Sequence, residues 1–283
     1  MNSVIERPVI DVPEMVDDSS EIKLSATRIK TFLQCPRQYR FHYVDEIPTM
    51  LTGALAFGQV IHQVLHNLQM WRLTHGEPLS AQVAMYDFTR LWEEIESTEK
   101  PLFKTETEFV EYEELASLIL SGYVEAHRNL SPPILLEYPF EIPLQDEVSG
   151  RKYLLRGIID RVDQADNGLV IVDYKTSKRK PSPRQLAEDL QLTIYAFAAN
   201  RLFEQKVTRI VYYYLRDQTE FEITRDDGAI KVLLSETLPM VADDIASQRF
   251  KPKPGFYCRF CEYRELCNEE GGVDLRRYEP REN

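Results

Sequence analysis

Long apolar runs are missing from this sequence of 283 residues: none reaches eighteen residues, and the first residues lack the basic and apolar pattern of an export signal. We therefore expect neither a membrane span nor secretion, and a reducing, cytoplasmic environment. The phosphate-binding sequence GxxxxGK(S/T) is also missing. Because nucleotide-driven motors use that motif, we expect no motor in this chain, and any helicase would be a partner.

Positive charge is scarce overall, and the formal net charge of −12 argues against a nucleic-acid partner, because neutralising phosphates supplies much of the affinity. The charges are segregated, however. Residues 93–114 hold nine acids and two bases, whereas residues 175–184 hold five bases and no acid. Further basic stretches lie at 28–40 and 251–264. Each cluster taken alone is typical of a solvated protein face.

With 43% hydrophobic and 28% charged residues, the chain has the composition of a globular protein. Its length suits one large domain, or one domain with an insertion. We expect a flexible lead-in over residues 1–23, a single domain over 24–267 and a tail over 268–283. Within the domain, residues 77–131 are predicted to be a helical insertion. We expect it to shape access to the functional site that the motifs described below would form.

Periodicity and capping residues predict most elements of this domain. Ser25 suits the N-cap of a helix that ends at Cys35-Pro36, and a second short helix follows. Ser182, with Pro183 and Gln185, begins a helix expected to run to about Phe203. The other predicted elements are a helix over 54–73, a strand over 134–144, a hairpin over 207–224 and a helix over 230–246. This mixture indicates an α/β protein.

The strongest local signal is a hairpin. Two runs rich in β-branched residues, 156–163 and 169–175, flank Asn167-Gly168, a dipeptide typical of a tight primed turn. With these two residues as the loop, Asp160 pairs with Lys175, and Asp173 lies on the same face. Two carboxylates and one ammonium group would then meet in a small volume.

The residues around these charges are apolar and expected to be buried: Ile158, Ile159, Val170, Ile171 and Val172. Charges beside a core cost several kcal/mol unless they are paired or bound to metal. Two acids with one lysine suit Mg²⁺ or Mn²⁺, and the lysine could orient a water or steady phosphate charge. The simpler alternative is an ordinary salt bridge between Asp160 and Lys175 on an exposed sheet face.

Three other groups of residues could carry chemistry. His62 and His66 are neighbours on the 54–73 helix, which suits a zinc site or two surface histidines. Gln191 and Tyr195 project together from one helix, as a hydrogen-bonded surface pair would. The four cysteines form the pattern Cys35 with Cys258-x2-Cys261-x5-Cys267. They suit a compact inorganic centre or zinc, and a disulfide pair is disfavoured by the absent export signal.

Taken in order, four motifs resemble those of the RecB-like branch of the PD-(D/E)xK nuclease superfamily: Gly58-x-x-x-His62, Gly157-Ile-Ile-Asp160, Asp173-Tyr174-Lys175 and Gln191-x-x-x-Tyr195. The cysteine pattern resembles the iron–sulfur version of this branch and is similar to the AddB nuclease domain. The resemblance covers roughly residues 24–267. Each motif alone is weak, and their shared order and spacing make the resemblance strong.

The resemblance implies a restriction-endonuclease-like α/β core, with a mixed central sheet flanked by helices and a C-terminal iron–sulfur segment over 251–267 joined to Cys35. It implies a metal-dependent DNA nuclease, more an exonuclease than an endonuclease. Such an enzyme would act on single-stranded DNA ends in repair or recombination and leave 5′-phosphates. A helicase or another repair protein is the implied partner.

The resemblance also assigns roles to single residues. One or two Mg²⁺ or Mn²⁺ ions would be held by His62, Asp160, Asp173 and the backbone carbonyl of Tyr174. Lys175 would orient the attacking water or stabilise the phosphate, while Gln191 and Tyr195 would face the metal and contact the DNA strand. Glu137 is an outside candidate for a metal contact. A 4Fe–4S cluster would be held by Cys35, Cys258, Cys261 and Cys267.

Two other functions fit the same residues. A CRISPR-associated nuclease that processes new spacers has similar cysteines, a similar histidine and a similar DxK motif. A catalytically inactive iron–sulfur subunit that binds DNA or acts as a scaffold would keep the fold without the reaction.

Overall fold

A computed structural model describes residues 22–105, 107–223 and 227–271 of the protein. Most of the expected lead-in and tail therefore lies outside the described residues. Within them, Ile22–Leu24 forms strand β1, which pairs in parallel with the strand that contains Tyr153. Ile22 and Lys23, which we assigned to the lead-in, thus belong to a strand of the sheet. Helix α10 (Arg264–Glu269) likewise includes the first two residues of the expected tail.

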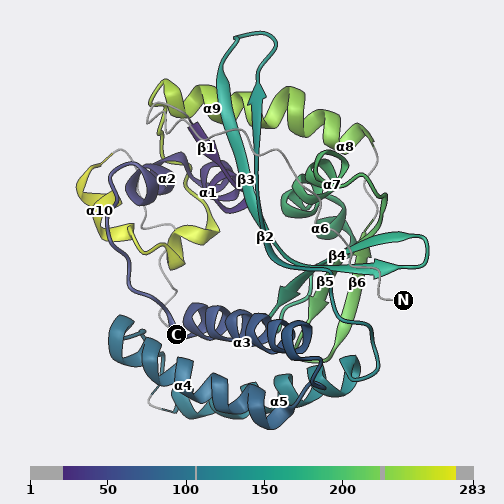
Figure 1. The fold of residues 1–283 in the computed structure, drawn as a ribbon. Coiled ribbons are helices and arrows are strands. Elements are labelled where there is room, and N and C mark those ends of the chain that lie inside the picture. Colours follow the sequence, from purple (N-terminus) through teal and green to yellow (C-terminus); the bar gives the residue numbers. More distant parts are fainter. Residues whose placement is uncertain (1–21, 106, 224–226, 272–283) are drawn as a thin grey trace.

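A six-stranded mixed sheet forms the centre of the fold (Figure 1). After β1, its strands are β2 (Leu135–Gln145), β3 (Lys152–Ala165), β4 (Gly168–Lys175), β5 (Val207–Tyr214) and β6 (Thr219–Ile223). Their order is β1-β3-β4-β5-β6, and β2 pairs with the other edge of β3. The β1–β3 and β4–β5 pairs are parallel and the others are antiparallel. The expected α/β fold with a mixed sheet is confirmed.

The long strand β3 joins two parts of the sheet. Its first half pairs with β1 at residues 153–155, and its second half pairs with β4 at residues 161–165. Strand β2 follows the opposite edge of β3. Among the described pairings, residues 156–160 therefore have no strand neighbour on the edge that faces β1 and β4. Ile158, which we expected to be buried, lies in this gap and is 51% exposed.

The turn between β3 and β4 differs from the expected one. Ala165 pairs with Gly168, so the loop consists of Asp166 and Asn167. Gly168 has a φ angle of +146°, and a Cβ atom there would lie 2.2 Å from the carbonyl oxygen of Lys206. This close approach to the chain that enters β5 uses the glycine within the strand. The pairing moves by two residues, and an even shift leaves the paired residues 161–165 and 168–172 on their expected faces, but Asp160 no longer pairs with Lys175.

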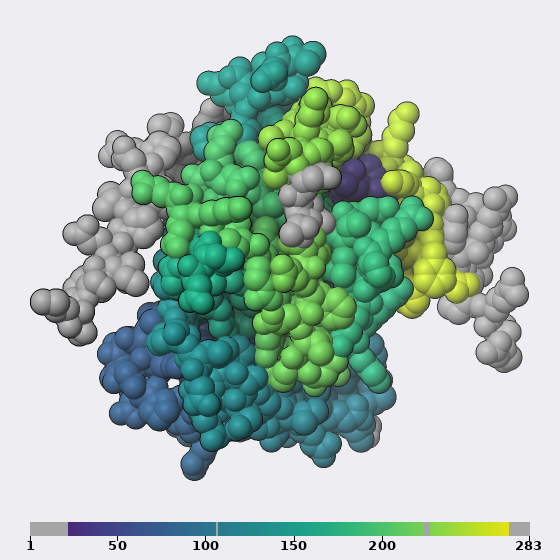
Figure 2. Space-filling view, turned by 90° about the vertical axis from the view of Figure 1, so that its right-hand side faces the viewer, coloured from purple at the N-terminus to yellow at the C-terminus, as the bar shows by residue number. Residues whose placement is uncertain are grey.

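Three helices form a lobe on one face of the sheet: α3 (Gly53–His75), α4 (Ala81–Glu99) and α5 (Glu108–His127). Their apolar sides pack on Val170, Val172 and Tyr174 of β4. The expected helix over 54–73 is confirmed as α3, whereas the described part of 77–131 is helical in α4 and α5 and not between them. The lobe lies at one end of the molecule and the β2–β3 hairpin at the other (Figures 1 and 2).

The other core lies on the opposite face, where Leu169 and Ile171 of β4 are buried. The remaining helical elements are α1 (Ala26–Gln34), α2 (Pro36–Tyr43), α6 (Pro183–Ala187), α7 (Leu190–Leu202), α8 (Asp227–Val232), the π-helical turn η1 (Leu233–Thr237), α9 (Leu238–Ala246) and the 3-10 turn η2 (Phe256–Phe260). Among the described residues, every helix is too short or too polar to traverse a lipid bilayer.

Most other element predictions are confirmed, and one is wrong. The strand over 134–144 is β2, the hairpin over 207–224 is β5 and β6 as far as residue 223, and the helix over 230–246 passes through η1. The helix expected from Ser182 to Phe203 is instead divided into α6 and α7. Ser182 forms the expected capping box of α6, but Asp189 then caps a new helix by accepting a hydrogen bond from the Leu192 amide at 3.1 Å.

Candidate active site

The gap in the sheet brings together the two acids and the lysine of the hairpin. Asp173 is 2% exposed, and its Oδ2 atom lies 2.6 Å from Lys175 Nζ. That oxygen is buried and makes no well-aligned hydrogen bond, so this contact is an ion pair rather than a directed bond. Asp160 instead accepts a hydrogen bond from the backbone amide of Tyr174 at 2.8 Å. An exposed salt bridge between Asp160 and Lys175 is therefore not what the structure forms.

Helix α3 brings His62 to the same place. His62 Nδ1 lies 3.4 Å from Asp160 Oδ2. The approach of the helix to the end of β4 is close, because a Cβ atom at Gly58 would lie 3.4 Å from Thr176 Oγ1. His66, one turn further along, lines the same cleft, together with Gly58, His62, Glu137 and Thr176. The cleft gives solvent access to the group.

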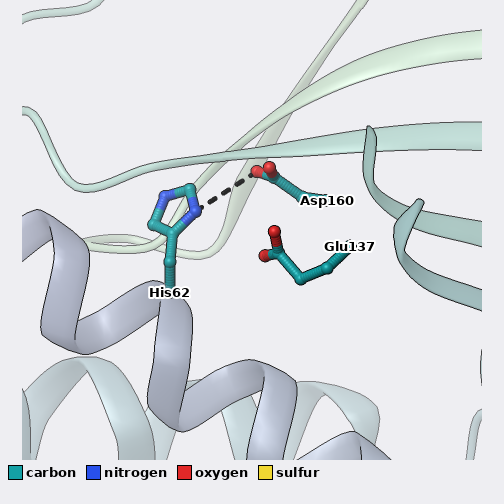
Figure 3. A group of neighbouring side chains, drawn as sticks. All are labelled: His62, Glu137 and Asp160. Atoms are coloured by element: carbon teal, nitrogen blue, oxygen red, sulfur yellow. Dashed lines mark ion pairs between the residues drawn. The ribbon is translucent and has the colours of Figure 1, made fainter. Parts of the chain in front are cut away.

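Glu137 of β2 completes a group of three ligand-type side chains. The ligand atoms of His62, Glu137 and Asp160 all lie within 4.8 Å of one another, and the three side chains point toward a common centre (Figure 3). Strand pairing passes from Leu136–Arg161 to Tyr138–Ile159, so Glu137 and Asp160 stand across from each other between these pairs. In the sequence, Glu137 matches the family motif only loosely. The register of β2 against β3 is what places Glu137 beside Asp160.

The backbone at Glu137 is strained. Its φ angle is +44°, in the left-handed region that costs a residue with a side chain roughly 1 kcal/mol or more. Such strain persists only where the surroundings enforce it, and it is often found at functional sites. Here it accompanies the placement of a third carboxylate beside Asp160 and His62.

The protonation preferences of the group suit a cation. Burial lowers the pKa of His62, which keeps the imidazole in the neutral form that can bind metal. Burial and the nearby charge of Asp173 raise the pKa of both Asp160 and Glu137. These carboxylates therefore repel one another in a poorly hydrated place, and a divalent cation would relieve that repulsion.

Gln191 and Tyr195 of α7 hold Asp173 from the other side. Gln191 Nε2 donates to Asp173 Oδ1 at 2.7 Å and to the Tyr195 hydroxyl at 3.0 Å. The Tyr195 hydroxyl donates to the carbonyl oxygen of Ile158 at 2.9 Å, which ties α7 to the unpaired stretch of β3. Tyr195 is only 4% exposed, so the structure assigns it a role inside the protein.

Tyr174 presents its backbone to the site and its side chain to the helical lobe. Its hydroxyl lies 2.7 Å from the Tyr123 hydroxyl of α5 and accepts a hydrogen bond from Arg161 Nη1 at 3.2 Å. Arg161 is 3% exposed and forms two hydrogen bonds of 2.6 Å each with Asp163. This paired, buried arginine anchors β3 and β4 to the lobe directly behind Asp160 and Asp173.

The four cysteines line one largely apolar pocket, and all are free thiols. Cys35 lies between α1 and α2, and the others come from the segment that contains η2 and α10. Burial raises the pKa of Cys261 to about 11. Two donors point at the sulfur atoms: Arg37 Nη1 lies 3.7 Å from Cys267 Sγ, and the Gly255 amide lies 3.4 Å from Cys258 Sγ.

Hydrogen bonds also join the two chain segments around this pocket. Lys253 Nζ donates to the Leu33 carbonyl at 2.7 Å, and the Tyr257 hydroxyl donates to the Gln34 carbonyl at 2.6 Å. His42 Nδ1 lies 2.8 Å from the Tyr263 hydroxyl. The cysteines are thus brought together by ordinary contacts of the protein, and α2 and α10 lie close together in Figure 1.

Known proteins resemble this chain in two ways. The family model described as PD-(D/E)XK nuclease superfamily matches residues 23–268. An ATP-dependent helicase/nuclease protein of Oceanobacillus iheyensis is 25% identical over 60% of this chain and 14% of that protein. The protein of the same name in Streptococcus agalactiae is 27% identical over 80% of this chain and 18% of that protein.

A second kind of relative is shorter. The CRISPR-associated exonuclease Cas4 of Francisella tularensis subsp. novicida is 27% identical over 43% of this chain and 60% of that protein. The chain therefore spans a small part of the helicase/nuclease proteins and about three-fifths of the shorter protein.

Proposed function

The chain belongs to the PD-(D/E)XK nuclease superfamily, and on that premise we propose that it is a metal-dependent DNA nuclease. The observation that carries the proposal is the convergence of His62, Glu137, Asp160, Asp173 and Lys175 at the gap in the sheet. Within this function, we propose exonuclease action on single-stranded ends in repair or recombination, with 5′-phosphate products. The names of the relatives support both a nuclease and a helicase partner.

The metal would be one or two Mg²⁺ or Mn²⁺ ions, held by His62, Asp160, Asp173 and the backbone carbonyl of Tyr174, with Glu137 added to this set. Carboxylate and carbonyl oxygens with one neutral imidazole are ligands that such ions accept. The ligand atoms of His62, Glu137 and Asp160, which all lie within 4.8 Å of one another, support this fit. A divalent ion here would lower the pKa of a bound water and neutralise charge on the phosphate and the leaving oxygen.

The protein's own side chains then have defined tasks. Lys175 would orient the attacking water or stabilise the charge that grows on the phosphate. Gln191 forms hydrogen bonds with both Asp173 and Lys175 and so fixes the positions of the two side chains. We propose that it also contacts the DNA strand. Tyr195 acts through Gln191 and Asp173, in keeping with its burial. Beyond Thr176 at the cleft, Lys178 and Arg179 are exposed and suited to bind flanking phosphates.

For the cysteine pocket we propose a structural 4Fe–4S cluster held by Cys35, Cys258, Cys261 and Cys267. The four thiols line one pocket, and Arg37 and the Gly255 amide lie within 3.7 Å and 3.4 Å of two of the sulfur atoms, as donors to thiolate ligands would. Four thiolates would also hold zinc tetrahedrally, and the choice of the cluster follows the resemblance of the cysteine pattern. Joining such distant points of the chain would lower the entropy of the unfolded state. This loss would stabilise the folded protein by up to roughly 5 kcal/mol.

The test uses anaerobically purified protein and DNA labelled at the 5′ or the 3′ end, single- and double-stranded, with Mg²⁺, Mn²⁺ or EDTA. We expect metal-dependent cleavage of single-stranded ends that disappears in Asp173→Ala and persists in Asp166→Ala. The second variant removes an exposed acid from the β3–β4 turn, away from the gap. The label released first gives the polarity. Cleavage that survives in Asp173→Ala would overturn the assignment.

A second candidate is favoured by one relative. The similarity to the CRISPR-associated exonuclease supports a spacer-processing nuclease built on the same site. The same assay distinguishes both nucleases from the third candidate, the inactive scaffold protein. Such a protein would bind DNA and retain iron but would cleave no DNA with any metal.

A further inference from the structure

The lysine of the site rests on a tyrosine that the sequence motifs do not include. Tyr212 of β5 is 3% exposed, and Lys175 Nζ lies 4.4 Å from the centre of its ring. Because β5 is parallel to β4 and pairs Tyr212 with Asp173, the ring lies beside both charges of the ion pair. The negative face of an aromatic ring attracts a cation, and the attraction is strongest where water is excluded.

Gln191 bridges Asp173 and Lys175 in one orientation only. Its Nε2 atom donates to Asp173 Oδ1 at 2.7 Å, and its Oε1 atom accepts from Lys175 Nζ at 3.2 Å. The flipped amide would turn its NH₂ group to the ammonium and its oxygen to the carboxylate, and both contacts would be repulsive. The geometry of the ion pair therefore depends on whatever holds this amide in place.

Tyr212 and Asp189 hold the side-chain amide of Gln191 in place. The Tyr212 hydroxyl shares its one proton between two acceptors, Asp189 Oδ1 at 2.8 Å and Gln191 Oε1 at 3.3 Å. The same Asp189 oxygen accepts the hydrogen bond from the Leu192 amide at 3.1 Å that caps α7. One carboxylate oxygen thus fixes both the tyrosine and the helical turn that carries Gln191.

We propose that Tyr212 and Asp189 are positioning residues of the nuclease site, which hold Gln191 and, through it, the Lys175–Asp173 pair in the arrangement the reaction uses. The inference rests on the proposed function and deepens it. Asp189 also pairs with Lys30 of α1 at 3.3 Å, but the Lys30 side chain is 45% exposed. Because water and salt screen such a surface pair, the tyrosine and the cap carry the effect.

The first test compares two neighbouring tyrosines of β5. Tyr212→Phe keeps the ring under Lys175 and removes the hydroxyl, whereas Tyr213→Phe removes a buried hydroxyl that bonds Gln218 on the opposite face at 2.8 Å. Each variant loses one buried tyrosine hydroxyl, although the acceptor of Tyr212 is a carboxylate and that of Tyr213 is a neutral amide. We expect kcat to fall about tenfold in Tyr212→Phe, with the KM for DNA unchanged, and to stay within twofold of wild type in Tyr213→Phe. Equal kcat values in the two variants would overturn the proposal.

Asp189 is tested by a conservative and a disruptive change. Asn caps helices as well as Asp does and can still accept from Tyr212, so Asp189→Asn should retain at least half of the wild-type kcat. Asp189→Ala loses the cap and the acceptor together, and its kcat should fall more than tenfold. Rescue of the alanine defect by asparagine is the signature of positioning. Equal loss in both variants would assign the effect to the negative charge and contradict the proposal.

A readout that needs no cleavage separates this proposal from the proposed function. The side-chain amide of Gln191, assigned by comparing amide nitrogen–proton NMR spectra of wild type and Gln191→Glu, should give a sharp, slowly exchanging pair of signals. We expect these signals to broaden or disappear in Tyr212→Phe and to remain in Tyr213→Phe. Wild-type protein that shows this pattern but cleaves nothing would refute the nuclease and leave the positioning geometry standing. Unchanged Gln191 signals in Tyr212→Phe would refute the positioning itself.

Discussion

Lys175 pairs with Asp173, two residues before it on the same strand, and not with Asp160 across the hairpin. The Nζ–Oδ2 distance is 2.6 Å, and Asp173 is also one of the residues that we propose as metal ligands. The lysine therefore occupies the place of a cation beside that oxygen. Asp160 is left to His62 and to the Tyr174 amide, so each acid has its own partners.

Replacing Lys175 tests whether its ammonium group and a metal ion compete for the same oxygen of Asp173. Lys175→Met leaves the buried Asp173 without a cation, which should lower the free energy of unfolding by about 3 kcal/mol in metal-free buffer and abolish cleavage. Mn²⁺ should then raise the melting temperature more in this variant than in wild type, because the ion no longer displaces an ammonium. Lys180→Met, which breaks an exposed pair with Asp217, should cost under about 1 kcal/mol and keep the wild-type metal response.

Glycine at position 137 should stabilise the protein while harming its activity. Glu137→Gly relieves a φ angle of +44° and removes a carboxyl whose pKa is raised by burial. We expect the melting temperature to rise by about 2–4 °C, the shift that corresponds to roughly 1 kcal/mol, while metal affinity and cleavage fall at least tenfold. Gln248→Gly relieves a similar angle of +52° at an exposed position after α9 and should stabilise without affecting cleavage. Lower stability of Glu137→Gly would contradict the strain argument.

Stability should depend on pH through His127 of α5. Burial, with smaller contributions from nearby charges, lowers its pKa to about 4, and the side chain is 3% exposed. In the unfolded chain a histidine takes up its proton near pH 6.5, so the folded state loses stability as the pH falls from about 6.5 to 4. The loss attributable to this residue is about 3 kcal/mol. Denaturant unfolding of wild type and His127→Phe across this range measures it, and parallel curves for the two proteins would refute it.

Loss of one cysteine should remove the iron–sulfur cluster that we propose. Cys261→Ser should abolish the visible absorption of the cluster, lower the iron content and lower the melting temperature, while the contacts of Lys253 and Tyr257 keep the two chain segments near each other. Glu262→Gln changes an exposed neighbour and should keep full iron. A serine variant with wild-type iron content and melting would count against the structural cluster. Zinc in place of iron in the wild-type protein would overturn the cluster assignment itself.

The sequence by itself determined the motif residues and most of the elements. Hairpin alternation and capping residues are local signals, so β3, β4, α1, α3 and the start of α6 followed from spacing alone. The predicted turn was wrong because Gly168 is required where the backbone of Lys206 approaches β4. Lys206 is distant in sequence, so the residues around the turn do not reveal this contact. The break before α7 was missed because Asp189 satisfies a cap there.

Only the tertiary structure decided how the site is assembled. The gap at residues 156–160 exists because β1 and β4 pair with different halves of β3, and pairings between distant strands leave no mark in the local sequence. The same long-range geometry sets Glu137 beside His62 and Tyr212 under Lys175. Residue types and spacing therefore fix which chemistry is available, whereas strand order and burial decide which charged groups meet and which partners each of them has.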